Sequence, residues 1–223
     1  GNYGVDINTN FSNILEKILN IKGLKRLRIS SIEITELDDK FLDLLKNPIL
    51  CNHLHIPLQS GSDNILKRMN RKYDKKYFKE EISKIRKIRP DISITTDVIV
   101  GFPGETEKNF NECMEFIKEI NFSKIHVFPY SKRNGTMAAT MKDQVSGEIK
   151  KERTKKLLSL SKILEEKYNN SFIGKKEYCL IEKVDDNYSY GHCSNYIYLK
   201  IPKKYKVNEI VEVNIEQEMI INK

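Results

Sequence analysis

A glycine-containing loop that directly follows a β-branched run is the part of this chain best suited to bind a ligand. Residues 98–100 are Val, Ile and Val, which suit a strand buried on both faces. Gly101 and Gly104 come next, and glycines let the backbone approach a bound molecule closely. Ligands of α/β folds lie at the C-terminal ends of strands. Residues 101–104 therefore predict a binding site at a strand end.

Histidines and cysteines can also do chemistry, but their spacing predicts no metal site. We expect His53 and His55, two residues apart, to face opposite sides of a strand, and we discount a site that includes His126. The cysteines lack C-x-x-C spacing and are typical of reduced thiols in a cytoplasmic protein; they are Cys51, Cys113, Cys179 and Cys193.

The elements around the loop alternate between the helical period and the strand period. Helix starts are expected at Ser62, Asp74 and Thr106, whose side chains can cap the next helix. The pattern gives about four β units, which favour a parallel sheet with right-handed crossovers. Helices are expected near residues 11–19, 41–45, 63–69, 74–90 and 106–120, and strands near 26–30, 55–58, 92–100 and 125–130.

Length and charge limit the class of protein. The chain has 223 residues, which suits one medium domain with a small one, and no long apolar stretch that would cross a membrane. Its net charge of +8 favours a polyanionic partner such as RNA, or else reflects a solvated, lysine-rich surface. The start has neither a signal-peptide pattern nor a Met. We therefore expect a soluble, cytoplasmic piece of a larger protein.

The composition changes after a long basic helix. We expect this helix at residues 146–170, joining an α/β part at residues 1–145 to a β-rich, tyrosine-rich part at residues 171–223. About fifty residues of short strands suit a small, OB-like β-barrel, a class that often contacts RNA. The alternative is a plain β module that only packs against the first part.

Four motifs in a fixed order carry a resemblance to a known family. They are HLHIPLQSGSD at residues 53–63, MNRKY at 69–73, TDVIVGFPGET at 96–106 and HVFPYSKRNGT at 126–136. Together they resemble the radical SAM tRNA methylthiotransferases over nearly the whole chain. The first and last motifs look most like the branch that acts on threonylcarbamoyladenosine. The isopentenyladenosine branch tends to have a Leu-Pro-Val-Gln version, and the ribosomal-protein branch departs further.

The resemblance implies a fold and two cofactors. The fold would be the C-terminal part of a radical SAM (βα) barrel followed by a TRAM-like RNA-binding β-barrel. A [4Fe-4S] cluster, held by C-x-x-x-C-x-x-C, would cleave S-adenosylmethionine to a radical, and a second cluster would help deliver the methylthio group. This chain contains neither cysteine triad. We therefore expect a fragment that lacks the N-terminal portion of its polypeptide and is inactive alone.

The resemblance also implies that the remaining strand ends form a wall of the S-adenosylmethionine pocket. Gln59 and Ser60 would donate to ribose or carboxylate oxygens, or else stabilise a turn. Arg71 would pair with the methionyl carboxylate, or else form a surface ion pair. Asp97 would bind a ribose hydroxyl or cap a loop, and Phe128 would contact the ligand or belong to the core. The implied cofactor-binding residues are Gln59, Ser60, Arg71, Asp97, Gly101, Phe102, Pro103, Gly104, Phe128, Tyr130 and Ser131.

A transfer RNA is the implied partner. Basic residues after the last motif and on the long helix would meet its phosphates, or else form a solvated surface; they are Lys132, Arg133, Lys151, Arg153 and Lys155. The substrate would be N6-threonylcarbamoyladenosine beside the anticodon. The alternatives are isopentenyladenosine, a ribosomal protein, or a truncated RNA-binding module without catalysis.

Overall fold

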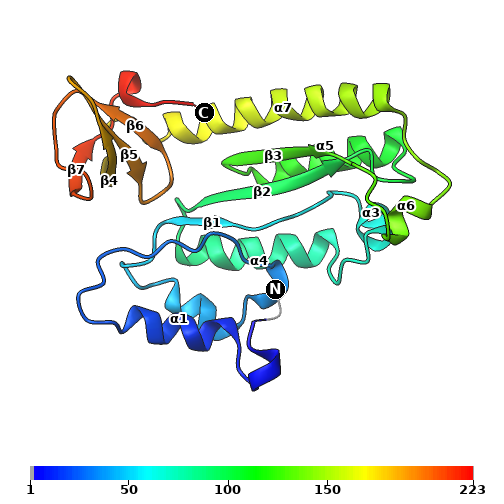
Figure 1. The fold of residues 1–223 in the computed structure, drawn as a ribbon, viewed down its shortest axis with the longest axis horizontal. Coiled ribbons are helices and arrows are strands. Elements are labelled where there is room, and N and C mark those ends of the chain that lie inside the picture. The colour runs from blue at the N-terminus through cyan, green and yellow to red at the C-terminus, as the bar shows by residue number, and fades with distance from the viewer. Residues whose placement is uncertain (1–2, 223) are drawn as a thin grey trace.

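The fold consists of two sheets that lie end to end (Figure 1). This computed structural model describes residues 3–222. The first sheet is parallel, with β1 (His53–His55), β2 (Ser93–Val100) and β3 (Lys124–Pro129) in the order β1-β2-β3. The second is antiparallel, with β4 (Lys176–Val184), β5 (Ser189–Cys193), β6 (Tyr198–Ile201) and β7 (Ile210–Asn214) in the order β6-β5-β4-β7. A partial α/β fold followed by a small all-β part is thus confirmed.

Most helices begin where the sequence predicts. Asp74 accepts a hydrogen bond from the Tyr77 amide at the start of α4, and Thr106 forms a capping box with Asn109 at the start of α5. The helices are α1 (Phe11–Leu19), α2 (Asp39–Leu44), α3 (Asp63–Arg68), α4 (Lys75–Ile88), α5 (Glu107–Ile120), α6 (Met137–Thr140) and α7 (Gly147–Asn170), with 3-10 turns η1 (Val5–Ile7), η2 (Ile34–Glu36) and η3 (Gln217–Met219). Among residues 3–222, no helix has the length and apolar character needed to cross a membrane.

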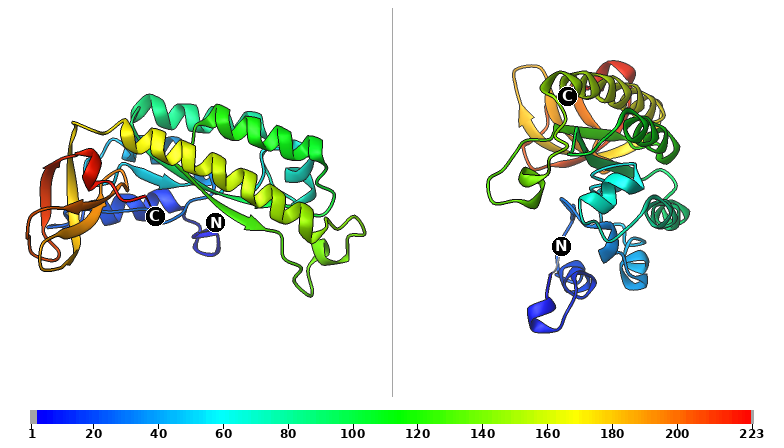
Figure 2. Two further views of the ribbon diagram at one scale, coloured as in Figure 1. Left: turned by 90° about the horizontal axis from the view of Figure 1, so that it is seen from above. Right: turned by 90° about the vertical axis from the view of Figure 1, so that its right-hand side faces the viewer.

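One face of the parallel sheet is covered by helices. The other, which we call the open face, has no helix over it among residues 3–222 and is covered at the N-terminal ends of the strands, where Tyr196 stacks on His53. Alternate strand residues such as Leu54, Val98 and Ile125 are buried in one core with side chains of α4, α5 and α7. Figure 2 shows these three helices side by side along the sheet. Because strand side chains alternate between faces, the intervening residues lie on the open face. Those residues are mostly polar.

Two local expectations are wrong, and one strand has no clear signal in the sequence. The expected strand at residues 26–30 makes only a single bridge, Leu27 with Leu50, so the parallel sheet has three strands among residues 3–222. Ser62 lies at the N-cap position of α3, but its hydroxyl donates to Glu112 Oε2 at 2.9 Å and caps no backbone amide. β5 was not expected, because its sequence SYGHC lacks β-branched residues.

The chain after β7 returns to the opposite edge of the C-terminal sheet. β7 is one edge and β6 the other, yet Ile220, a few residues after β7, forms a bridge with Leu199 of β6. The Ile221 amide also donates to the Tyr198 carbonyl at 3.0 Å. Enclosed side chains such as Cys179 and Ile215 form a separate core. Pairing that returns to the opposite edge is what a small barrel requires.

Candidate functional site

A cavity of about 460 Å³ opens at the C-terminal ends of β2 and β3. Strand residues of the open face form its floor, and the chain after β3 and the start of α6 form its rim. Its mixed aromatic and polar wall suits a small organic ligand. The lining residues are Gln59, Asp97, Ile99, Phe102, Phe128, Pro129, Tyr130, Ser131, Arg133, Thr136 and Ala138.

Six of the eleven residues predicted to bind a cofactor line this cavity: Gln59, Asp97, Phe102, Phe128, Tyr130 and Ser131. The other five are not in its lining. Ser60 is buried and its hydroxyl accepts from the Ser62 amide, while Arg71 lies 3.5 Å from the Glu33 carboxylate. Gly101, Pro103 and Gly104 belong to the loop behind the wall.

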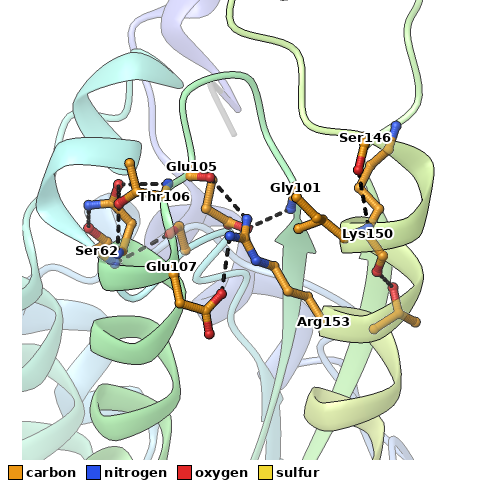
Figure 3. A network of polar contacts seen from close by, with 12 residues as sticks. Ser62, Gly101, Glu105, Thr106, Glu107, Ser146, Lys150 and Arg153 are labelled. Atoms are coloured by element: carbon orange, nitrogen blue, oxygen red, sulfur yellow. Dashed lines mark hydrogen bonds and ion pairs between the residues drawn. The ribbon is translucent and has the colours of Figure 1, made fainter.

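A buried ion pair shapes that loop (Figure 3). The Gly101 amide donates to Glu105 Oε1 at 2.8 Å, and Arg153 of α7 donates to the same oxygen at 2.7 Å and to the Glu105 carbonyl at 3.0 Å. Burial raises the pKa of Glu105, which these donors oppose. The Arg153 side chain is only 5% exposed. The prediction that Arg153 binds RNA is therefore wrong, because its guanidinium is enclosed and paired.

Packing against neighbouring side chains explains the two glycines of the loop. Gly101 has φ +70°, and a methyl group there would overlap the Lys150 side chain. Gly104 has φ +83°, and a methyl group there would overlap Arg68 and Asp143. Both backbone angles favour glycine. The close approach that the glycines permit is thus toward α3, α7 and the segment before α7.

Strain and an unpaired hydroxyl mark the cavity wall. Gln59 has φ +67°, a conformation that non-glycine residues adopt at a cost and that concentrates at binding sites. The Tyr130 hydroxyl is buried and has no hydrogen-bond partner within residues 3–222. The Tyr130 ring meets Phe102 edge-on at 5.3 Å. The wall therefore offers an aromatic surface together with an unsatisfied polar group.

Two histidines and a threonine continue the open face away from the cavity. His53 Nε2 and His55 Nδ1 both lie within hydrogen-bond distance of Thr95 Oγ1, at 3.1 and 2.9 Å. His55 Nε2 lies 3.3 Å from Asp97 Oδ1. The expectation that His53 and His55 face opposite sides is wrong, because residues two apart in a strand share a face.

The opposite end of the parallel sheet is closed by the C-terminal sheet. Tyr196, between β5 and β6, stacks on His53 and on His192, with ring centroids 4.4 Å apart in both pairs. The Arg28 guanidinium lies 4.8 Å from the centre of the same ring. Arg26 donates to the carbonyls of His192 and Cys193. These contacts join the two sheets.

A second, larger hollow of about 920 Å³ runs beside α7 and the end of β3. We call it the lysine groove after Lys132, Lys150, Lys151, Lys155 and Lys162, which line it. Pro129, Tyr130 and Ser131 line both this groove and the cavity. Of the residues predicted to bind RNA, Lys132, Lys151 and Lys155 lie in the groove, whereas Arg133 lines the cavity.

The four cysteines do not gather at one site. Cys51 and Cys113 are buried in the α/β part, and Cys179 faces Cys193 across β4 and β5. Within residues 3–222, no three His, Cys, Asp or Glu side chains are arranged to hold a metal ion. These residues therefore do not fit an iron–sulfur cluster, which needs three or four thiolates around one site.

Comparison with known proteins identifies the class. The sequence model of the radical SAM superfamily matches residues 4–117, which is 114 of the 223 residues, so the chain belongs to this superfamily. The fold agrees: the structure of coproporphyrinogen III oxidase (HemN) from Escherichia coli, a radical SAM enzyme, has a TM-score of 0.53 to this chain at 16% identity. The matched region covers 78% of this chain and 46% of the oxidase chain.

Within the superfamily, the chain is similar to methylthiotransferases. It is 43% identical to "Threonylcarbamoyladenosine tRNA methylthiotransferase MtaB" of Bacillus subtilis, over 88% of this chain and 46% of that protein. It is 40% identical to "tRNA-2-methylthio-N(6)-dimethylallyladenosine synthase" of Acetivibrio thermocellus, over 82% and 38%. The chain thus spans less than half the length of either relative.

Proposed function

We propose that this chain is part of a radical SAM tRNA methylthiotransferase and that its cavity binds S-adenosylmethionine. The observation that carries the proposal is the cavity at the ends of β2 and β3, whose wall contains six residues chosen from sequence motifs. S-adenosylmethionine supplies a methyl group and, when a cluster reduces it, a radical. The division into parts at residues 1–145, 146–170 and 171–223 belongs to the same proposal.

The residues present fit the nucleoside part of this cofactor. Phe102, Phe128 and Tyr130 offer apolar surface to a purine, and the unpaired Tyr130 hydroxyl offers it a hydrogen bond. The Asp97 carboxylate can accept from ribose hydroxyls or from the cofactor's ammonium group. The iron–sulfur cluster does not fit the cysteines of residues 3–222. We therefore expect this chain to bind the cofactor and to generate no radical by itself.

Titration calorimetry of S-adenosylmethionine into this chain tests the cavity. Asp97→Asn and Phe128→Ala should each weaken binding at least five-fold, because each removes a contact in the wall. Glu115→Gln, on the exposed face of α5, is the matched control and should leave binding unchanged. Equal affinity for all four proteins would contradict the cavity assignment.

We infer that RNA occupies the lysine groove. Several unburied lysines along α7, together with Leu158 and Tyr130, provide the cationic and apolar surface that phosphates and bases need. Lys151→Glu and Lys155→Glu should each weaken binding of a tRNA anticodon stem-loop and reduce the slope of log K against log salt by about one. Lys87→Glu on α4 is the charge-matched control. An unchanged salt slope in both groove variants would contradict this inference.

The threonylcarbamoyladenosine branch is the proposed substrate class, on the strength of the motifs HIPLQSG and HVFPYSKR. This chain is 43% identical to a relative named for threonylcarbamoyladenosine and 40% identical to one named for dimethylallyladenosine, which is the same nucleoside as isopentenyladenosine. Mass spectrometry of tRNA nucleosides from a strain that lacks the full gene decides between them. Loss of the methylthio group from threonylcarbamoyladenosine is expected. Its loss from isopentenyladenosine in the same spectra, or the loss of a methylthio group from a ribosomal protein in a separate protein mass spectrum, would contradict the branch.

The alternative of an RNA-binding module without catalysis makes a different prediction. In that case tRNA nucleosides would be unchanged in the deletion strain, while the anticodon stem-loop would still bind the groove. This second outcome would leave the groove inference intact and remove the enzyme proposal.

A further inference from the structure

A row of polar groups crosses the open face of the parallel sheet from its closed end to the cavity. It begins at His53, which is 2% exposed and stacks on Tyr196. It continues through Thr95 and His55, at 3.1 and 2.9 Å, to the Asp97 carboxylate, 3.3 Å from His55 Nε2. Asp97 lines the cavity. The row therefore connects the junction of the two sheets with the ligand wall.

Strand register explains why these side chains meet. His55 pairs with Thr95 across β1 and β2, and both point to the open face. Asp97 follows Thr95 by two residues and shares that face. The neighbouring strand residues Leu54 and Thr96 point to the other face and are buried under the helices. The row is thus fixed by the backbone of two hydrogen-bonded strands.

The proton positions in the row follow by elimination. Burial lowers the pKa of His53 to about 3, with Arg28 adding to the effect, so this ring is neutral and carries one proton. His53 Nδ1 is buried without a partner, and a buried N–H without an acceptor is costly. The proton therefore lies on Nε2 and is donated to Thr95 Oγ1.

The remaining positions are assigned by placing one proton in each contact of the row. The Thr95 hydroxyl then accepts from His53 with one lone pair and donates its own proton to His55 Nδ1. An accepting Nδ1 places the His55 proton on Nε2, which faces the Asp97 carboxylate. Every donor in the row has an acceptor in front of it. His126, with its ring 5.6 Å from that of His55, lies beside the row and outside it.

We propose that His53, Thr95 and His55 form a hydrogen-bonded relay that holds Asp97 in position to accept from a hydroxyl or ammonium group of the cavity ligand. Under the proposed function, on which this inference rests, that ligand is S-adenosylmethionine. His55 and Thr95 are positioning residues, because they act on the ligand through Asp97. The relay also ties the cavity wall to Tyr196, and hence to the C-terminal sheet.

The first test is the proton arrangement, which does not depend on any ligand. The chain has four histidines, so long-range ¹H–¹⁵N spectra of labelled protein can be assigned with single variants. His53 and His55 should both carry their proton on Nε2. A His55 ring protonated on Nδ1 alone would overturn the relay.

The second test is a matched pair at Thr95. Thr95→Val has the same shape without the hydroxyl, whereas Thr95→Ser keeps the hydroxyl. Thr95→Val should weaken S-adenosylmethionine binding about five-fold and change the His55 Nδ1 shift, and Thr95→Ser should restore both to within two-fold of the original. Equal affinity of folded Val and Ser variants would overturn the positioning role. If the unaltered chain bound no S-adenosylmethionine, the proposed function would fail, and the histidine proton positions would decide the relay.

Discussion

The two ends of the parallel sheet are built in contrasting ways. At the N-terminal ends of the strands, Tyr196 stacks on the rings of His53 and His192, with the Arg28 guanidinium 4.8 Å from its ring centre, and the C-terminal sheet covers this end. At the C-terminal ends, a cavity remains open, with a strained Gln59 and an unpaired Tyr130 hydroxyl in its wall. Buried polar atoms without a partner and residues with positive φ occur at both ends: His53 Nδ1 and Tyr196 at the first, the Tyr130 hydroxyl and Gln59 at the second. The ends differ in what lies over them, because stacked rings fill the first, whereas the second is a cavity that a ligand can enter.

The contrast extends to how each end is held. The closed end relies on stacked rings contributed by both sheets. The open end relies on the buried Glu105–Arg153 pair, which fixes the loop behind the cavity from the side of α7 (Figure 3). Side chains that filled the cavity would exclude a ligand. The Glu105–Arg153 pair instead stabilises the loop from the side that faces away from the cavity.

The largest expected effect on stability comes from breaking the Glu105–Arg153 pair at the open end. Arg153→Met should destabilise the chain by about 3–5 kcal/mol, because it leaves the Glu105 carboxylate buried without its partner. Burial raises the pKa of Glu105, so the deficit should shrink as the pH falls through that raised pKa and the acid becomes neutral. Urea unfolding measures both effects. Lys151→Met, at an exposed position two residues before Arg153 on α7, is the control and should change stability by less than about 0.5 kcal/mol.

A smaller effect is expected at the closed end. The pKa of His53 is lowered from its ordinary value of 6.5 to about 3, so the folded state resists protonation. Stability from this group is present above pH 6.5 and is lost as the pH falls toward 3. Relative to His53→Gln, the chain should therefore lose about 2 kcal/mol between pH 7.5 and pH 5. Parallel stability curves in urea would contradict the burial of a neutral ring.

The smallest effect is expected at Tyr196, where two variants distinguish the contribution of ring stacking from that of backbone strain. This residue has φ +70°, which is unfavourable for a bulky side chain. Tyr196→Ala loses the stacked rings and keeps the strain, whereas Tyr196→Gly loses the rings and relieves it. The glycine variant should be more stable than the alanine variant by about 1 kcal/mol in urea unfolding. The reverse order would mean that the junction does not impose this backbone angle.

Local signals in the sequence were sufficient for most elements of the α/β part. Cap residues such as Asp74 and Thr106 act on amides two or three residues away, so their effect is visible in a short window. The β-branched run before Gly101 likewise identified β2 and the end where the cavity opens. Residues 26–30 alternate as a strand does, but a ladder needs a neighbour distant in sequence, and their only pairing is one bridge.

The burial of Arg153 has a signal in the sequence, namely its position relative to the apolar residues of α7. Arg153 lies four residues before Leu157 and seven before Leu160, so helical periodicity puts it on the buried stripe of α7. The run of basic residues around it suggested an exposed position instead. Lys150 and Lys162 of the lysine groove were missed, although they share a helix with Lys151 and Lys155. Arg133 stays a predicted RNA contact; its place in the cavity lining depends on the direction of the chain after β3, which no local pattern encodes.

Under the proposed RNA binding, the length of α7 has a consequence for the size of the nucleic acid. With 24 residues, the helix is about 36 Å long, close to one turn of a double helix. The lysine groove runs along it, and the C-terminal sheet follows its last turn (Figure 1). Under the same proposal, a tri- or tetranucleotide would contact either the lysine groove or the C-terminal sheet, whereas a folded stem-loop would be long enough to contact both.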